Sequence, residues 1–144
     1  MIRHAGLVAL RQGGLWRGVL IEGPSGAGKS DLALRALDQG FRLVADDRVE
    51  VWSDAGRLFG RAPDALRGLI EARGVGVVPV APVAFCEITL VARLGTPRRM
   101  PDPATETILG VAIPLLVSAP LEPSAPAKLS RAMEAFDAAH KRRI

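Results

Sequence analysis

The segment from Gly23 to Ser30, Gly-Pro-Ser-Gly-Ala-Gly-Lys-Ser, fits the pattern G-x-x-x-x-G-K-[ST]. Glycines let the backbone adopt positive φ angles, so that successive N–H groups and a helix N-terminus can face phosphate oxygens. In this pattern Lys29 neutralises phosphate charge and the Ser30 hydroxyl holds Mg²⁺. The segment therefore predicts a phosphate loop that binds ATP with Mg²⁺. Its residues are Gly23, Pro24, Ser25, Gly26, Ala27, Gly28, Lys29 and Ser30.

The residues around this segment make the pattern specific. The apolar run 19–21 precedes it, as expected of a strand, and the helix-like stretch 31–37 follows it. The alternative is a Gly/Ser turn with a surface lysine, which does not require this context. A strand–loop–helix arrangement favours a true phosphate loop.

A pair of carboxylates, Asp46 and Asp47, ends the apolar stretch 41–45 downstream of the loop. In phosphate-loop proteins a carboxylate at such a position reaches the metal or the attacking hydroxyl. The alternative is an Asx turn that closes the strand. Because a phosphate loop lies upstream, we favour a catalytic role for the pair.

The elements that must position these groups follow from hydrophobic patterning and turn residues. The segments predicted as strands are 4–10, 15–22, 41–45, 49–52, 57–60, 84–92 and 108–118. Helices are predicted over 31–37 and 126–142, and a short one begins at Pro63 within 63–71. Residues 95–105 form a Pro-rich, charged loop. The predicted fold is a single α/β domain over residues 1–144, with a central mixed sheet and few helices.

Composition limits the partners. Aromatic residues make up 4% of the 144 residues and tyrosine is absent, which argues against base-stacking platforms for nucleic acid. The net charge is +4, and part of it lies in the basic tail 140–143, which we expect to be a solvated end. We therefore expect no nucleic-acid partner. A basic surface suits nucleotide phosphates or an acidic protein.

Compartment follows from the cysteine count and from hydropathy. Cys86 is the only cysteine, so it can form no internal disulfide, and no metal-ligand spacing surrounds it. No apolar run reaches the ~18 residues of a membrane-spanning helix. We expect a cytoplasmic protein with no membrane partner.

The order of motifs resembles one known family. A histidine in the first strand is followed by GPSGAGKS, RLVADDRVEV, IEARGVGVV, ARLG and ILGVAIPLL. This order resembles the catalytic domain of bacterial HPr kinase/phosphorylase, which phosphorylates a seryl hydroxyl of the phosphocarrier HPr. LVADDRV and E-x-R-G-x-G-[IV] are specific to that family, and the chain resembles its short, single-domain forms from alphaproteobacteria. The resemblance implies an ATP-dependent protein-serine kinase with an HPr-type substrate, and a homo-oligomer, specifically a hexamer.

The resemblance also implies roles for individual residues. Asp47 becomes the proton acceptor for the substrate serine, and Asp46 its acidic neighbour. Glu71 becomes the second Mg²⁺ ligand beside Ser30. His4 and Arg93 join as active-site residues, the arginine steadying charge on the transferred phosphoryl group.

One segment departs from the family pattern. Full-length members carry P-V-x-P-G-R-N after the late strand, and this arginine-containing segment is implicated in the reverse, phosphorolytic reaction. Here residues 119–125 are Ala-Pro-Leu-Glu-Pro-Ser-Ala, without the glycine or the arginine. We therefore expect kinase activity with little or no phosphorylase activity. Two alternatives stay open on these motifs, a small-molecule kinase of the same fold and a catalytically inactive nucleotide-binding regulatory module.

Overall fold

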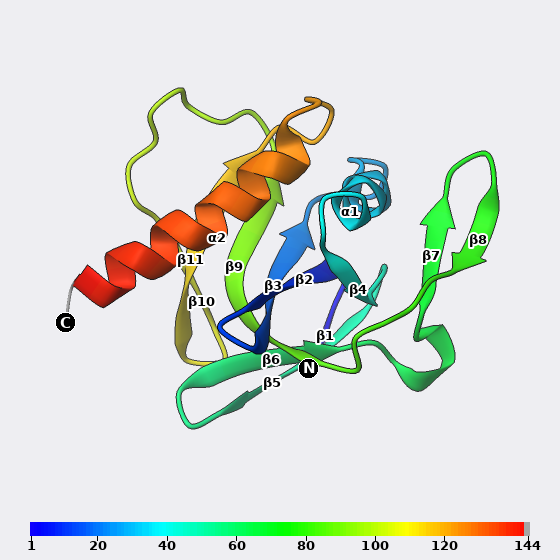
Figure 1. Cartoon of the computed structure of the whole chain (residues 1–144), viewed down its shortest axis with the longest axis horizontal. Helices are drawn as coiled ribbons and strands as arrows, with labels where there is room; N and C mark the ends of the chain where they lie inside the picture. The colour runs from blue at the N-terminus through cyan, green and yellow to red at the C-terminus, as the bar shows by residue number, and fades with distance from the viewer. Residues whose placement is uncertain (143–144) are drawn as a thin grey trace.

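The computed structural model describes the backbone of residues 1–142 and the side chains of residues 1–136 (Figure 1), so the side chains of the basic tail lie outside the described residues. The strands are β1 (Ile2–Arg3), β2 (Gly6–Gln12), β3 (Leu15–Glu22), β4 (Arg42–Ala45), β5 (Val49–Asp54), β6 (Arg57–Arg61), β7 (Leu69–Ala72), β8 (Gly76–Pro79), β9 (Cys86–Leu94), β10 (Thr105–Ile108) and β11 (Val111–Ser118). The helices are α1 (Lys29–Leu37), α2 (Ala125–Arg142) and the 3₁₀ turn η1 (Asp64–Leu66).

A mixed sheet of nine strands forms the centre of the molecule. Its order is β1-β5-β6-β9-β3-β2-β4, and the β10–β11 hairpin joins it through β11, which pairs with β9. The hairpin of β7 and β8 forms a separate two-stranded sheet, which stands apart at the right of Figure 1. The predicted class, an α/β domain with a central mixed sheet and few helices, is confirmed.

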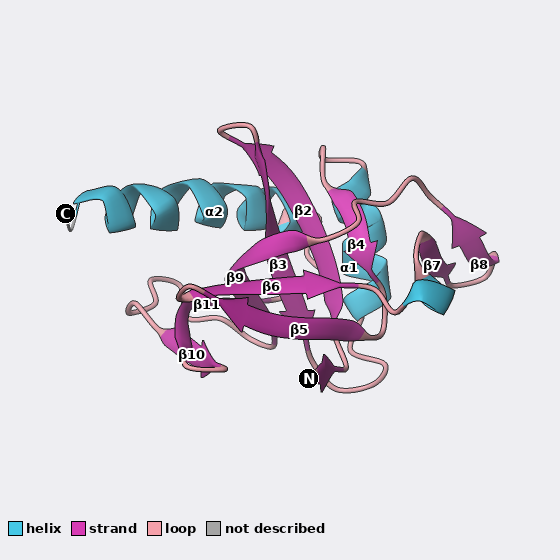
Figure 2. Cartoon of the chain, turned by 90° about the horizontal axis from the view of Figure 1, so that it is seen from below, coloured by secondary structure: helices cyan, strands magenta, loops and turns pink. Residues whose placement is uncertain are grey.

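The sheet is buried on both faces, which explains the nearly continuous apolar runs of its central strands. On one face Val8, Val19 and Ile21 pack with residues of α1 and α2. On the other face Leu7 and Leu20 pack against residues of the β5–β6 hairpin and the β10–β11 hairpin. In Figure 2, β2 and β3 cross the β5–β6 hairpin, and α2 lies above β5 and β6.

The strands that matter for the site end at the same edge of the sheet. β9 runs parallel to β3 and β11 runs parallel to β9, while β4 is parallel to β3 through the intervening antiparallel β2. The registers place Glu22 opposite Arg93 and Arg93 opposite Val117. On the other side, Leu7 pairs with both Leu20 and Ala45. In open α/β sheets ligands bind at such a carboxyl edge, and the predicted phosphate loop leaves β3 here.

Two predicted elements differ from the structure. The short helix expected within 63–71 is limited to η1, because Gly68 with φ 73° turns the chain and β7 follows. Glu71 therefore lies on a strand. The single strand expected over 108–118 is a hairpin, because Leu109 (φ 48°) and Gly110 (φ 79°) both adopt positive φ, as a two-residue hairpin turn requires.

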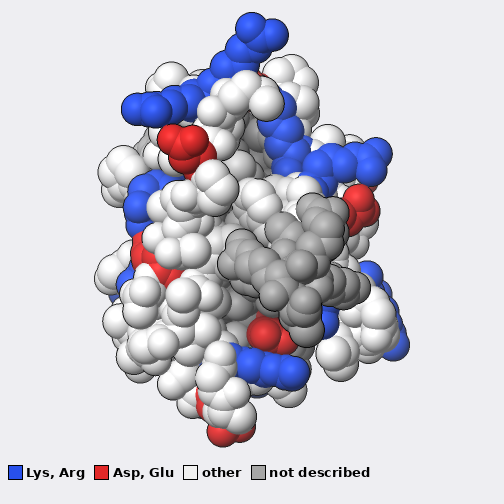
Figure 3. Space-filling model, turned by 90° about the vertical axis from the view of Figure 1, so that its left-hand side faces the viewer, with Lys and Arg blue, Asp and Glu red and all other residues white. Residues whose placement is uncertain are grey.

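The surface carries both signs of charge. Figure 3 shows basic and acidic side chains interspersed over one face. Among the described residues, no helix is both long enough and apolar enough to span a membrane.

Candidate active site

The phosphate loop has the backbone geometry that its glycines predict. Gly26 (φ 81°) and Gly28 (φ 106°) are left-handed, and Gly28 is the N-cap of α1. The Ala27 N–H donates to the Pro24 carbonyl at 3.0 Å, and the Leu32 N–H donates to the Gly28 carbonyl at 2.9 Å. The loop therefore closes on itself and passes directly into the helix. A helix start of this kind favours an anion.

Lys29 lies folded over its own loop. Its Nζ donates to the carbonyl oxygens of Gly23, at 2.7 Å, and Pro24, at 3.1 Å. Both bonds join the ammonium group to backbone oxygens rather than to a carboxylate. The charge is therefore held at the loop, where a phosphate would meet it.

Asp46 is a buried bridge between three elements. Its side chain belongs to a residue only 8% exposed. Oδ1 accepts a hydrogen bond from the Ser30 hydroxyl at 2.8 Å, and Oδ2 accepts one from the Glu71 N–H at 3.0 Å. Because each oxygen has a protein donor, Asp46 holds α1, the end of β4 and β7 together.

Asp47 lies at the centre of a strained turn. Its φ is 70°, and the Arg48 N–H donates to the Asp46 carbonyl at 2.8 Å across it. This is a γ-turn with positive φ, a rare and strained conformation. The Ala5 N–H, next to His4, donates to the Asp47 carbonyl at 3.1 Å and holds the turn in place. The Asp47 side chain is exposed, and strained residues of this kind cluster at active sites.

One cavity of about 680 Å³ brings most of the predicted residues together. The phosphate loop contributes all its residues except Pro24, and the sheet edge and the β7–β8 hairpin contribute His4, Asp46, Asp47 and Glu71. Sequence reasoning missed other lining residues: Asp31, Leu34, Arg73 and Leu121. Sequence spacing could have indicated two of them. Leu34 follows Ser30 by one helical turn, and Arg73 follows Glu71 by two residues on a hairpin, so each shares a face with a predicted site residue.

Arg93, like Pro24, is a predicted site residue that does not line this cavity. It lies at the end of β9 in a cluster of four charges, Arg3, Glu22, Arg93 and Glu106. Arg93 pairs with Glu106 and lies 3.8 Å from Glu22, while Arg3 pairs with both glutamates. Glu22 immediately precedes the phosphate loop, so the cluster borders the loop outside the cavity lining.

The donor set suits Mg²⁺ but not an all-protein metal cage. Among the described residues, no group of three or more His, Cys, Asp and Glu is arranged to hold a metal. The cavity offers the oxygens of Ser30 and Glu71, and Mg²⁺ is typically bound by one or two protein oxygens together with phosphate. The Ser30 hydroxyl donates a hydrogen bond to Asp46, so the lone pairs of its oxygen are left for a cation.

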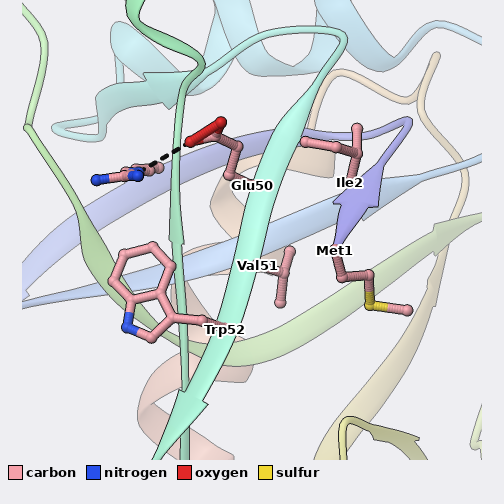
Figure 4. Close-up of a pocket in the computed structure, with 6 residues that line it drawn as sticks. Met1, Ile2, Glu50, Val51 and Trp52 are labelled. Carbon is pink, nitrogen blue, oxygen red and sulfur yellow. Dashed lines mark hydrogen bonds and ion pairs between the residues drawn. The ribbon is translucent and has the colours of Figure 1, made fainter.

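Other hollows lack this chemistry. One of about 400 Å³, drawn in Figure 4, is lined by Met1, Ile2 and β5–β6 residues, and its Arg61–Glu50 pair is closed at 2.9 Å. Another, of about 450 Å³, lies at the β2–β3 turn and includes Trp16, Phe85 and Cys86. Burial, and secondarily the charge of Glu87, raises the pKa of the Cys86 thiol, so it stays protonated and unreactive.

Comparisons with known proteins point to one family. A family model described as the HPr Serine kinase C-terminal domain matches residues 3–89. The HPr kinase/phosphorylase of Limosilactobacillus reuteri (strain DSM 20016) is 42% identical over 120 residues, which cover 73% of this chain and 37% of that protein. The HPr kinase/phosphorylase of Streptococcus thermophilus (strain ATCC BAA-491 / LMD-9) is 53% identical over 64 residues, covering 44% of this chain and 21% of that protein.

The chain thus spans well under half the length of these curated relatives. A solved structure described as the Hpr(Ser) kinase/phosphatase from Coxiella burnetii is similar over almost the whole chain. Its TM-score is 0.81 at 27% sequence identity, and the match covers 98% of this chain and 99% of that chain.

Proposed function

This chain belongs to the HPr serine kinase C-terminal domain family, and on that premise we propose that it transfers the γ-phosphoryl group of ATP to a seryl hydroxyl of an HPr-type phosphocarrier protein. The observation that supports this best is the cavity that joins the phosphate loop to Asp47 and Glu71. Phosphoryl transfer needs a site that positions phosphates and acceptor together and neutralises charge.

The loop and α1 bind the triphosphate. The N–H groups around Gly26 and Gly28 and the positive end of the helix dipole attract phosphate oxygens. Lys29 exchanges its two carbonyl partners for the phosphates, which is favourable because a charge-assisted bond to an anion is stronger than a bond to a neutral carbonyl.

Asp47 accepts the proton of the acceptor serine. As the serine oxygen forms its bond to the γ-phosphorus, the bond from that phosphorus to the bridging oxygen breaks and ADP leaves. Asp46 is less suited to be the base, because both of its oxygens already accept hydrogen bonds inside the protein. We assign Asp46 the positioning of Ser30 and Glu71 instead.

Ser30 and Glu71 would hold Mg²⁺, which when bound neutralises charge between the phosphate groups. For charge on the transferred group, we propose Arg73, which lines the cavity beside Glu71. Arg93 is paired with glutamates at the border of the loop, so its proposed effect on the transferred group passes through Glu22 and the loop.

A protein acceptor fits this site better than a small molecule. Asp47, Glu71 and Arg73 are all exposed, so the acceptor side of the cavity is open. The β7–β8 hairpin beside it presents Val75 and Val77, which are 78% and 65% exposed. Apolar side chains on a projecting hairpin suit contact with a protein surface.

The test is incubation with labelled ATP, Mg²⁺ and the HPr-type protein of the same organism, followed by mapping of the phosphosite. We expect label on one serine, and none when Lys29→Ala replaces the wild type. ATP binding without transfer to any hydroxyl acceptor would instead support an inactive regulatory module. Transfer to small molecules alone would support a small-molecule kinase of the same fold.

We also propose that the reverse reaction is weak. Phosphorolysis must bring inorganic phosphate to a phosphoserine that carries about −2 charge, which requires cations. Segment 119–124 offers the carboxylate of Glu122, which is paired with Lys128 at 2.6 Å. Phosphoserine-HPr with millimolar phosphate should release little pyrophosphate, and release as fast as the forward reaction would contradict the proposal.

A homo-oligomer, specifically a hexamer, is the proposed assembly. Light scattering should then give a mass well above the 15.2 kDa of one chain. A strict monomer at micromolar concentration would rule this assembly out.

A further inference from the structure

The segment that follows β11, residues 119–124, forms a tight turn at the rim of the cavity, and we call it the strap. The Glu122 N–H donates to the Ala119 carbonyl at 3.3 Å, which places Pro120 and Leu121 at the corners of the turn. Leu121 lines the cavity and yet is 82% exposed. A large apolar side chain is thus held at the mouth of a cavity lined mainly by polar groups.

The strap is fastened to the helix and the loop that bind phosphate. The Arg35 guanidinium donates to the Pro120 carbonyl and, at 3.2 Å, to the Glu122 carbonyl. The Pro120 ring also lies close to the phosphate loop, 3.6 Å from where a Cβ on Gly28 would be. Leu121 therefore has a defined place relative to a bound triphosphate.

The strap and the catalytic aspartates flank the phosphate loop on opposite sides. β4, which is followed by Asp46, and β11, which is followed by the strap, each lie two strands from β3 in the sheet. With neighbouring strands ~4.8 Å apart, their ends are roughly 19 Å apart along the sheet. On α1, Arg35 points about 140° around the helix axis from Ser30, which faces Asp46.

A nucleotide bound to this loop can be oriented by the positions of its two ends, the γ-phosphate and the nucleoside. Its γ-phosphate must lie on the side of Asp47, where the proposed acceptor enters. The nucleoside must then leave the loop on the other side, where the strap closes the edge. Since Arg35 already occupies the carbonyls of Pro120 and Glu122, the strap offers the nucleoside an apolar surface at Leu121.

We propose that Leu121 is the contact surface for the nucleobase of the phosphoryl donor, and that Arg35 is the positioning residue that holds it there. This assignment rests on the proposed function, since it requires that the loop binds a nucleoside triphosphate. Covering an exposed leucine with the flat face of a base removes apolar surface from water on both partners. The contact contributes to nucleotide affinity and not to phosphate affinity.

The experiment compares the dissociation constants of Mg·ATP and Mg·tripolyphosphate, which has the phosphates without the base, by calorimetry. Leu121→Ala should weaken ATP binding about fivefold and leave tripolyphosphate binding unchanged within about twofold. Leu121→Met, which restores apolar surface, should recover most of the ATP affinity. Leu15→Ala removes another exposed leucine, 54% accessible, at the other end of β3 and should change neither.

Arg35→Lys keeps the positive charge but loses the forked geometry that binds two carbonyls. It should weaken ATP binding and spare tripolyphosphate, as Leu121→Ala does. An equal loss for both ligands in Leu121→Ala, or no loss for either, would overturn the proposal. Equal affinity of the wild-type protein for tripolyphosphate and ATP would also overturn the proposal, although phosphate binding by the loop would remain supported. Failure of the wild type to bind either ligand would overturn the proposed function itself.

Discussion

The two flanks of the phosphate loop are built by different means. On the aspartate flank, a buried carboxylate, Asp46, accepts one bond from α1 and one from β7, and the neighbouring Asp47 is held in a strained backbone turn. On the strap flank, Arg35 donates from α1 to backbone carbonyls at the surface. A reacting group must be held within fractions of an ångström, whereas an apolar contact tolerates more movement. The aspartate flank should therefore be much more sensitive to substitution.

The largest effect is expected from Asp47→Asn. Asparagine tolerates the left-handed conformation at this position, so the turn should be retained while the proton acceptor is lost. Phosphoryl transfer should fall by about 10²–10⁴-fold, with Mg·ATP affinity little changed. Steady-state kinetics and calorimetry together check this. Equal losses of binding and turnover would make Asp47 chiefly a metal ligand.

The next largest effect distinguishes the contributions of Arg73 and Arg93 to kcat. Arg73→Ala removes a cation from the cavity wall and should lower kcat by about 10²-fold. Arg93→Ala acts through the glutamate cluster and should lower it by less. The two variants should be assayed side by side with saturating ATP. A larger loss for Arg93→Ala would show that Arg93 leaves the glutamates to meet the transferred group.

Glu71→Gln should raise the Mg²⁺ concentration needed for half-maximal activity, because a hard cation loses an anionic oxygen. The N–H of residue 71, which binds Asp46, is unchanged by this substitution. Glu50→Gln, at a carboxylate paired with Arg61 outside the cavity, is the matched control and should leave the titration unaltered. An unaltered titration for Glu71→Gln would remove Glu71 from the proposed metal site.

The smallest expected effects are on the free energy of unfolding, which can be compared between the two flanks. Asp46→Ala leaves a serine hydroxyl and a backbone N–H without their acceptor and should lower the free energy of unfolding by about 1–3 kcal/mol. Glu122→Ala breaks an exposed pair with Lys128 and should cost about 0–1 kcal/mol. Denaturant titration measures both. Similar losses would contradict the contrast between the flanks.

Sequence patterns predicted the phosphate loop and the strands around it because both depend on local residue types. Glu71 was expected in a short helix, and only the positive φ of Gly68 shows why the chain turns into β7 instead. The bridge made by Asp46 could not be predicted, because it joins segments that meet only in the folded chain.

Long-range pairing likewise decides where Arg93 lies. Its position at a strand end is clear from sequence. Its partner Glu106 comes from a separate hairpin, so the charge cluster could not be predicted from the sequence. Leu121 belongs to the segment whose departure from the family pattern was recognised. Its place at the cavity depends on the carbonyl bonds to Arg35.

The γ-turn at Asp47 also restricts how this position can diverge among relatives. Side chains other than glycine, asparagine and aspartate are disfavoured at a φ of 70°, so the backbone admits few replacements whatever the chemistry requires. In a lineage that had given up phosphoryl transfer, selection for the carboxylate would end while the demand of the turn would persist. Such a lineage should drift to asparagine or glycine here, and either residue after an intact phosphate loop would mark an inactive descendant.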